Sequence, residues 1–255
     1  MICALLSAAA IGQKPEAIIL KASVAPVVDG VIEAVWEEAN TYNISKAYNG
    51  EVPTLGAEGE TTWRALWNTE GIYFLIQVAD DAFFPNWADS PENPNTWEYD
   101  ILELYFDINT MNLEDGLGAS DNKGHHLISP GFIEGQIDGT PLYDTKYTEV
   151  LFAHRVTDPN YISEYFIPFE VLTDSEGRVM PYSQIGFDVY VNDRDPIDGG
   201  SNRAVWSNTG NTDPPWVNMD DCGIISLEGN IHFVRATDLQ QVLTQGCEVA
   251  RFTPY

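Results

Sequence analysis

Apolar and polar side chains alternate along most of this chain, which is the pattern of β-strands that bury one of their two faces. Strong strands are predicted over residues 62–67, 72–78, 101–108, 150–156, 161–167 and 185–191. Weaker strands are predicted over residues 18–24, 125–128, 204–207 and 224–227. Helical signals are confined to one or two turns over residues 33–39 and 169–172.

The connections between these strands are rich in Gly, Pro, Asn and Asp, and none reads as a long helix. About ten short strands of this kind predict an all-β fold, an antiparallel β-sandwich of jelly-roll-like form with very short helices. Trp36 and Trp63 are predicted core residues. Long loops, which in a compact sandwich usually carry function or ions, are expected over residues 82–96, 109–124 and 193–202.

The chain divides into three segments. Residues 1–13 form a short apolar run ending in small residues, like the core and cleavage site of a signal peptide, although the basic start is missing. Residues 14–230 hold the predicted sandwich, and residues 231–255 a C-terminal tail of unassigned role. No stretch is long and apolar enough to span a bilayer. These features predict a secreted or periplasmic protein, in which Cys222 and Cys247 either form one disulfide or remain separate buried thiols.

The chain is strongly acidic, with 39 Asp and Glu against 12 Lys and Arg and a net charge of −27. This balance argues against nucleic acid or an anionic membrane surface as a partner, because both need basic patches. It favours calcium, which takes oxygen ligands. Asp195 and Asp198 are the candidate ligands of a structural calcium ion. Their loop fails the EF-hand pattern, because Ile197 stands at its fifth position, and a plain acidic turn is the alternative.

A flat indole and a carboxylate lie close together in residues 93–107. Trp97 opens the segment, and Glu103 follows mid-strand among large apolar residues, where a carboxylate needs a hydrogen-bond partner. The pair is a candidate sugar platform, since an indole covers apolar C–H faces and a carboxylate accepts hydroxyl protons. The alternative is a core Trp and a Glu at the sheet rim. Trp206 is a second candidate indole for the platform, and Trp216 a third.

Catalytic and metal alternatives find less support in the pattern. His125 and His126 are adjacent on a predicted strand and so face opposite sides, which disfavours a shared metal site and leaves His126 as a candidate hydrogen-bond partner of a ligand. Glu98 and Glu103 are five residues apart and fall on opposite strand faces, which disfavours the paired carboxylates of a glycosidase.

Several motifs recur in the order and spacing of a known family. They are Val28-Asp29-Gly30 with Trp36 and Ala39, Ala65-Leu66-Trp67-Asn68 with Ile72-Tyr73-Phe74, Val78-Ala79-Asp80-Asp81, residues 97–103, Tyr165-Phe166-Ile167-Pro168, residues 186–193, and Val205-Trp206-Ser207-Asn208 with Trp216. From about residue 27 to 227 the chain resembles the family nine carbohydrate-binding modules. The resemblance implies a calcium-containing β-sandwich that binds reducing ends of sugars and is often appended to xylanases.

By the same resemblance, Trp97 and Trp206 would form an aromatic clamp and Glu103 would bond sugar hydroxyls. Asn192 and Asp193 match the segment near that clamp. The chain departs from the family in one place. Members that bind reducing ends carry an arginine on the strand after the long loop, whereas residues 124–128 here contain none.

The favoured function is therefore a secreted, non-catalytic module that holds a plant-type polysaccharide or oligosaccharide between aromatic side chains. A glycoside hydrolase is its candidate partner. Two alternatives stay open at this point. One is a haem-binding electron-transfer sandwich, which needs Met or His ligands facing one cavity. The other is a glycoside hydrolase acting by itself.

Overall fold

The computed structural model describes residues 14–48, 61–88, 95–108, 124–134, 139, 142–143, 147–173, 184–195, 201–210 and 214–229. The predicted signal peptide and C-terminal tail lie outside these residues. Within them, the chain forms thirteen strands and three single-turn 3₁₀ helices. The helices are η1 (Ala34–Glu38), η2 (Asn86–Ala88) and η3 (Thr96–Glu98).

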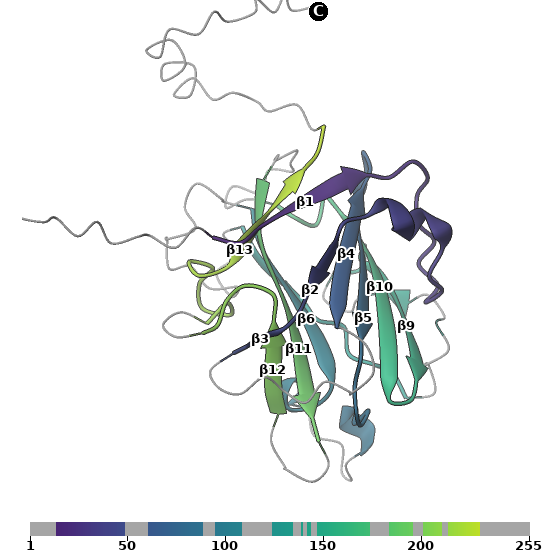
Figure 1. The fold of residues 1–255 in the computed structure, drawn as a ribbon, viewed down its shortest axis with the longest axis vertical. Helices are drawn as coiled ribbons and strands as arrows, with labels where there is room; N and C mark the ends of the chain where they lie inside the picture. Colours follow the sequence, from purple (N-terminus) through teal and green to yellow (C-terminus); the bar gives the residue numbers. More distant parts are fainter. Residues whose placement is uncertain are drawn as a thin grey trace, which may run out of the picture.

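The strands form two sheets that pack face to face as a β-sandwich, as predicted (Figure 1). The first sheet contains β3 (Lys46–Ala47), β6 (Ile101–Asp107), β7 (His125–Ile128), β11 (Gln184–Arg194), β12 (Ser201–Val205) and β13 (Gly223–Leu227). The second contains β2 (Thr41–Asn43), β4 (Thr62–Trp67), β5 (Gly71–Val78), β8 (Leu142–Tyr143), β9 (Leu151–Thr157) and β10 (Asn160–Pro168). β11 is central in the first sheet, with β6 on one side and both β12 and β13 on the other.

β1 (Glu16–Lys21) joins the two sheets. Its first four residues pair with β13 and its last two residues pair with β4, so it crosses from one layer to the other at one end of the sandwich (Figure 1). Both pairings are parallel, which departs from the fully antiparallel sandwich expected from sequence. The other ladders of the described strands are antiparallel.

The core lies between the two inner faces and is rich in aromatic rings. Trp63 of β4 and Phe187 of β11 meet across the sheets with ring centroids 5.0 Å apart. Phe74 of β5 stacks on Phe187 at 5.1 Å. Trp63 and Trp36 are both fully buried, which confirms them as core residues.

Most predicted strands match observed ones to within a few residues at each end. The predicted turn at residues 33–39 forms η1, whereas residues 169–172 form hydrogen-bonded turns without becoming a helix. No helix in the described part of the chain is long and apolar enough to cross a membrane.

Candidate functional site

A pocket of about 390 Å³ opens on the outer face of the first sheet. This volume falls within the range of about 300–1,000 Å³ that is typical of small-molecule sites. Its described lining residues are Trp97, Glu103, Tyr105, Leu127, Arg203 and Trp216.

Strand alternation places four of these side chains on one surface. Glu103 and Tyr105 are two residues apart on β6 and so share a face. Leu127 of β7 stands directly opposite Tyr105 in the ladder. Arg203 of β12 reaches the same face from the far side of β11. The opposite face of the same strands carries the apolar residues of the sandwich core.

The two indoles come from turns beyond the strands. Trp97 sits in η3, just before β6, and is 48% exposed. Trp216 lies in a turn closed by hydrogen bonds from Val217 N and Asn218 N to Pro214 O, and is 40% exposed. They are the only tryptophans among the exposed large apolar side chains of the described residues. Large exposed rings at one pocket indicate a binding surface.

A buried carboxylate anchors the segment that precedes Trp216. Asp188 of β11 accepts hydrogen bonds from Ser207 N, Ser207 Oγ and Asn208 N at 2.7–3.0 Å. Gly210 follows with a φ of 73°, and a Cβ at this residue would collide with the Tyr48 ring. Only glycine allows this close approach at a left-handed φ. Tyr48 in turn lies against Trp216, with ring centroids 5.5 Å apart.

Glu103 is the acidic group of the pocket. Its side chain is only 7% exposed, and its Oε2 accepts a hydrogen bond of 3.0 Å from the Tyr105 hydroxyl. Burial raises the pKa of the Glu103 carboxyl group, and the positive charge of Arg203 and the bond from Tyr105 offset part of that rise. A carboxylate held in this way is a strong acceptor for a ligand hydroxyl.

Arg203 is the basic group of the pocket. Its Nε donates a hydrogen bond of 2.9 Å to Asn192 Oδ1, which fixes the orientation of the guanidinium. The Cζ atom lies 5.4 Å from the centroid of the Trp216 ring and 6.0 Å from that of Tyr48. These are cation–π distances. Arg203 therefore contacts one aromatic wall of the pocket while also lining its interior.

The structure corrects the place of Trp206. Its side chain is 6% exposed and lies in the core, with its ring 5.1 Å from Trp63 and 5.8 Å from Phe187. The expectation of a partly exposed Trp206 facing Trp97 is therefore wrong. The reason is strand alternation, because Trp206 continues the inward-facing set of Ala204. Trp216, the third candidate in the sequence, is the second exposed indole.

His126 and Asn192 also take specific places. His126 points to the inner side, opposite Phe106, and its Nε2 lies 2.8 Å from Thr173 O, so it does not line the pocket as expected. Leu127, one residue later, faces the pocket instead. Asn192 is fully buried beneath the pocket and reaches it through Arg203.

Asp193 faces the inner side of the sheet and belongs to a different cluster. Its carboxylate meets those of Asp80 and Asp100, with one oxygen from each within 4.8 Å of the others. All three residues are buried. Asp193 Oδ1 is buried and has no hydrogen-bond partner among the described residues. Asp195 is close enough for its charge to act on Asp80 and Asp193, whereas Asp198 lies outside the described residues.

This acidic cluster carries perturbed ionisation. Burial is the main cause, and it raises the pKa of Asp80 to about 6, of Asp193 to about 7 and of Asp100 to about 8. Repulsion among the carboxylates adds to the rise, and backbone hydrogen bonds from Ala82 to Asp80 and from Arg194 to Asp100 reduce it. Three buried carboxylates that repel one another are costly to ionise. Their all-oxygen donor set fits a hard divalent cation such as Ca²⁺.

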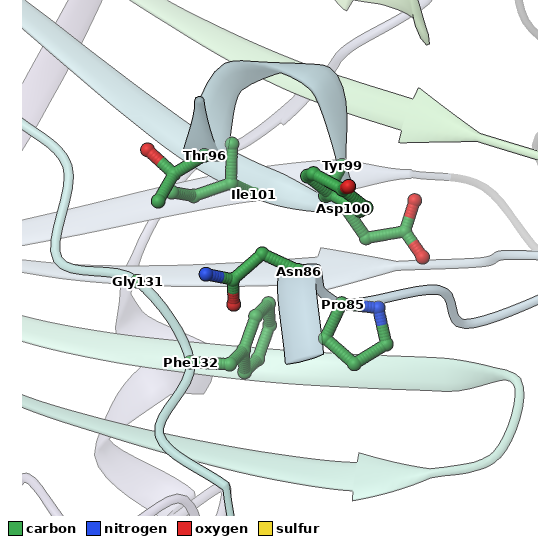
Figure 2. A pocket seen from close by; sticks show the side chains of 8 residues that line it. All are labelled: Pro85, Asn86, Thr96, Tyr99, Asp100, Ile101, Gly131 and Phe132. Carbon is green, nitrogen blue, oxygen red and sulfur yellow. The ribbon is translucent and has the colours of Figure 1, made fainter. Parts of the chain in front are cut away.

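A second, much smaller hollow lies beside Asp100, between Thr96, Asn86 and Phe132 (Figure 2). Its volume is about 10 Å³, which is roughly the space of one water molecule. The Asp100 carboxylate points away from this hollow (Figure 2). The hollow is too small for an organic ligand, so the larger pocket on the outer face is the candidate binding site.

Tyr105, Leu127 and Arg203 were not expected to be site residues. Tyr105 could have been found from its spacing to Glu103, since both share a strand face. Arg203 and Leu127 depend on which strands become neighbours, and no local signal specifies that.

The fold and the pocket together define an all-β binding domain. A family model described as carbohydrate family 9 binding domain-like matches residues 28–230, and the chain belongs to this family.

Two enzymes are similar in sequence to a large part of this chain. The chain is 26% identical over 171 residues to an endo-1,4-beta-xylanase A of Thermotoga neapolitana, covering 66% of the chain and 14% of the relative. It is 26% identical over 208 residues to the exoglucanase XynX of Acetivibrio thermocellus, covering 80% and 16%. The chain thus spans about one sixth or less of the length of these relatives.

Among solved structures, a family 9 carbohydrate binding module from Caldicellulosiruptor kristjanssonii in complex with cellotriose has the same fold. The TM-score is 0.57 at 14% identity, and the match covers 94% of this chain and 100% of that one.

Proposed function

We propose that this chain is a non-catalytic carbohydrate-binding module whose outer-face pocket holds an oligosaccharide. The observation that carries the proposal is the joint presence of two exposed indoles, Trp97 and Trp216, and the buried carboxylate of Glu103 in one pocket. Indole rings cover the apolar C–H faces of a sugar ring. Glu103, Tyr105 and Arg203 provide an acceptor, a hydroxyl and donors for its hydroxyl groups.

The relatives support a β-linked plant polysaccharide as the source of the ligand. The solved family member was crystallised with cellotriose, and the relatives by sequence are a xylanase and an exoglucanase. In those enzymes the matching part is a small fraction of the chain. A glycoside hydrolase, in the same chain or a separate one, is the corresponding partner of this module. A plant polysaccharide lies outside the cell that uses it, and a ligand of this kind supports a secreted or periplasmic location.

The pocket does not favour catalysis. A glycosidase needs two carboxyl groups roughly 5–10 Å apart that face the same bond. Glu103 is the one carboxylate among the described lining residues, and Asp193 lies on the opposite face of the sheet. The haem alternative has no support at Met219, which packs against Cys222 in a small core under the pocket. Cys222 is a buried free thiol, and Cys247 lies outside the described residues.

Titration calorimetry with cellotriose tests the proposal. Each exposed ring should contribute roughly 1–3 kcal/mol, by analogy with bases stacked on aromatic side chains. We expect Trp97→Ala and Trp216→Ala each to weaken binding about tenfold or more. Ile18→Ala, which truncates an exposed apolar side chain on β1, is the matched control and should bind like the unmodified protein. Unchanged titration heats in both Trp variants would contradict the proposal.

We also propose that Asp80, Asp100 and Asp193 hold a structural Ca²⁺ ion, with Asp195 adding to the negative field. The support is threefold: Asp193 Oδ1 has no hydrogen-bond partner in the described part of the chain, the three carboxylates lie close together, and all the donors are oxygen atoms. This set differs from the pair Asp195 and Asp198 that was expected from sequence, of which Asp198 lies outside the described residues. The ion would neutralise the cluster and hold together the chain segments that contribute to it.

A further inference from the structure

The turn that carries Trp97 depends on support from outside itself. η3 contains only three residues, and a single helical turn is marginal by itself, because closing it fixes several residues for few hydrogen bonds. Two backbone bonds close it, from Glu98 N to Asn95 O and from Tyr99 N to Thr96 O. The Asn95 side chain adds a bond of 3.1 Å from Nδ2 to Glu98 Oε1. These bonds are all local, so the orientation of the turn on the sandwich depends on tertiary contacts.

Arg194, the last residue of β11, makes such contacts with its half-buried side chain. Its Nη1 donates a hydrogen bond of 3.4 Å to Glu98 O. Its Cζ atom lies 4.4 Å from the centroid of the Tyr99 ring and 5.3 Å from that of Phe84, which are cation–π distances. These two rings are nearly parallel, with centroids 6.1 Å apart. One guanidinium therefore contacts both residues that directly follow Trp97.

The backbone beneath this contact is also fixed. Arg194 N donates a hydrogen bond of 2.8 Å to Asp100 Oδ1, and Phe84 N donates to Oδ2 of the same carboxylate. Asp100 N donates in turn to Phe84 O at 3.3 Å. The chain at Arg194 is thereby joined to the residue that follows Tyr99. The guanidinium consequently reaches η3 from a backbone that is itself bound to the same segment.

We propose that Arg194 is a positioning residue for Trp97, which holds η3 in the orientation that presents the indole to the sugar before the sugar arrives. Arg194 is not among the lining residues of the pocket, so it acts through Trp97 and not on the sugar itself. A turn that is already ordered loses less conformational freedom on binding than a loose one, and the affinity is correspondingly higher. This inference rests on the proposed function and adds the residue that orders one of its two indoles.

A double-mutant cycle on cellotriose binding tests this role. Arg194→Met removes the guanidinium and should weaken binding about three- to tenfold in the otherwise unmodified protein. In the Trp97→Ala background it should change the affinity by less than about twofold, because the ring that it positions is gone. Arg155→Met is the matched control. Arg155 is a half-buried arginine of the second sheet that also donates to backbone carbonyl groups, those of Gly30 and Asp29, and its loss should leave cellotriose affinity unchanged.

Amide hydrogen exchange of the sugar-free protein gives a readout separate from affinity. The Glu98 and Tyr99 amides, which close η3, should exchange about threefold faster or more in Arg194→Met and at the unmodified rate in Arg155→Met. Unchanged affinity in Arg194→Met, equal weakening in both Trp97 backgrounds, or unchanged exchange would overturn the inference while the proposed function stands. Absence of cellotriose binding by the unmodified protein would overturn both. If melting shows that Arg194→Met is not folded, Arg194→Lys takes its place. An ammonium lacks the planar face that lies over the rings, so the same dependence on Trp97 is expected.

Discussion

At the level of single residues, Trp206 and Trp216 lie ten positions apart and occupy opposite environments. Trp206 is packed in the core and a Cβ on Gly223 would strike its ring, whereas Trp216 is exposed in the pocket. We expect Trp206→Ala to lower the free energy of unfolding by about 3–5 kcal/mol, as for other large aromatic truncations in cores. Trp216→Ala should leave it nearly unchanged. Chemical denaturation of both variants measures the difference, and equal losses would contradict the assignment.

Glu103 gives the binding site a pH dependence whose sign can be worked out. Burial raises its folded-state pKa, so in the sugar-free protein its stabilising contribution is fully present below the unfolded pKa and is lost as the pH rises through the folded pKa. Sugar binding has the opposite dependence, because the ionised carboxylate is the stronger acceptor. We expect cellotriose affinity to fall as the pH drops below the raised pKa of Glu103. This pKa lies above the ordinary Glu value of about 4.3, so the fall should begin above that pH.

Titration calorimetry across this pH range checks the Glu103 prediction. Glu103→Gln should bind more weakly at neutral pH and show a flat profile over the same range. A fall in affinity that persists in Glu103→Gln would assign the pH dependence to another group.

At the level of elements, β11 contributes residues to both the core and the pocket. Its Asp188 binds Ser207 and Asn208, which begin the segment that leads to Trp216. The pKa of Asp188 is raised to about 6 by burial, even though Ser207 and Asn208 donate to it. Asp188→Asn replaces one acceptor oxygen by a donor amide. We expect the variant to lose roughly 1–3 kcal/mol of stability and to bind cellotriose more weakly, because the loop loses its anchor.

Thermal melts and titrations of Asp188→Asn test this role. Glu16→Gln removes the same charge from an exposed position on β1 and should change neither quantity. If Asp188→Asn loses stability but binds cellotriose with unchanged affinity, the anchoring role in sugar binding is wrong.

Local periodicity predicted the strands well, because a face buried in the sandwich imposes its alternation on the sequence. The same rule places Asn192 and Asp193 on opposite faces of their strand, because neighbours on a strand face opposite sides. It also places Trp206 on the same face as Ala204. What periodicity could not supply is the order of strands. Arg203 enters the pocket only because β12 and β6 flank β11, a long-range pairing that no short segment encodes. The Asp80, Asp100 and Asp193 cluster likewise depends on long-range structure, because β6 must pair with β11 and β5 comes from the other sheet.

At the level of the whole molecule, the acidic cluster connects the two layers of the sandwich. Asp80 directly follows β5 in the second sheet, whereas Asp193 lies in β11 of the first sheet. Asp100 directly precedes β6, and its carboxylate accepts hydrogen bonds from Phe84 N and Arg194 N. An ion held by all three carboxylates would bind the folded state and not the unfolded chain. It should therefore stabilise the fold by about 2.7 kcal/mol at a hundredfold excess over its dissociation constant.

Calcium removal should therefore lower the melting temperature, and the effect should reach the sugar site, because Asp100 lies two residues after the helix that carries Trp97. We expect chelation of calcium-loaded protein to lower the melting temperature and to weaken cellotriose binding.

Asp193→Asn should melt lower without chelator and respond little to it. Glu16→Gln, which removes a charge from an exposed position on β1, should retain the response of the unmodified protein. An identical melt with and without chelator would rule out the ion. A lower melt with unchanged cellotriose affinity would confine its role to the fold.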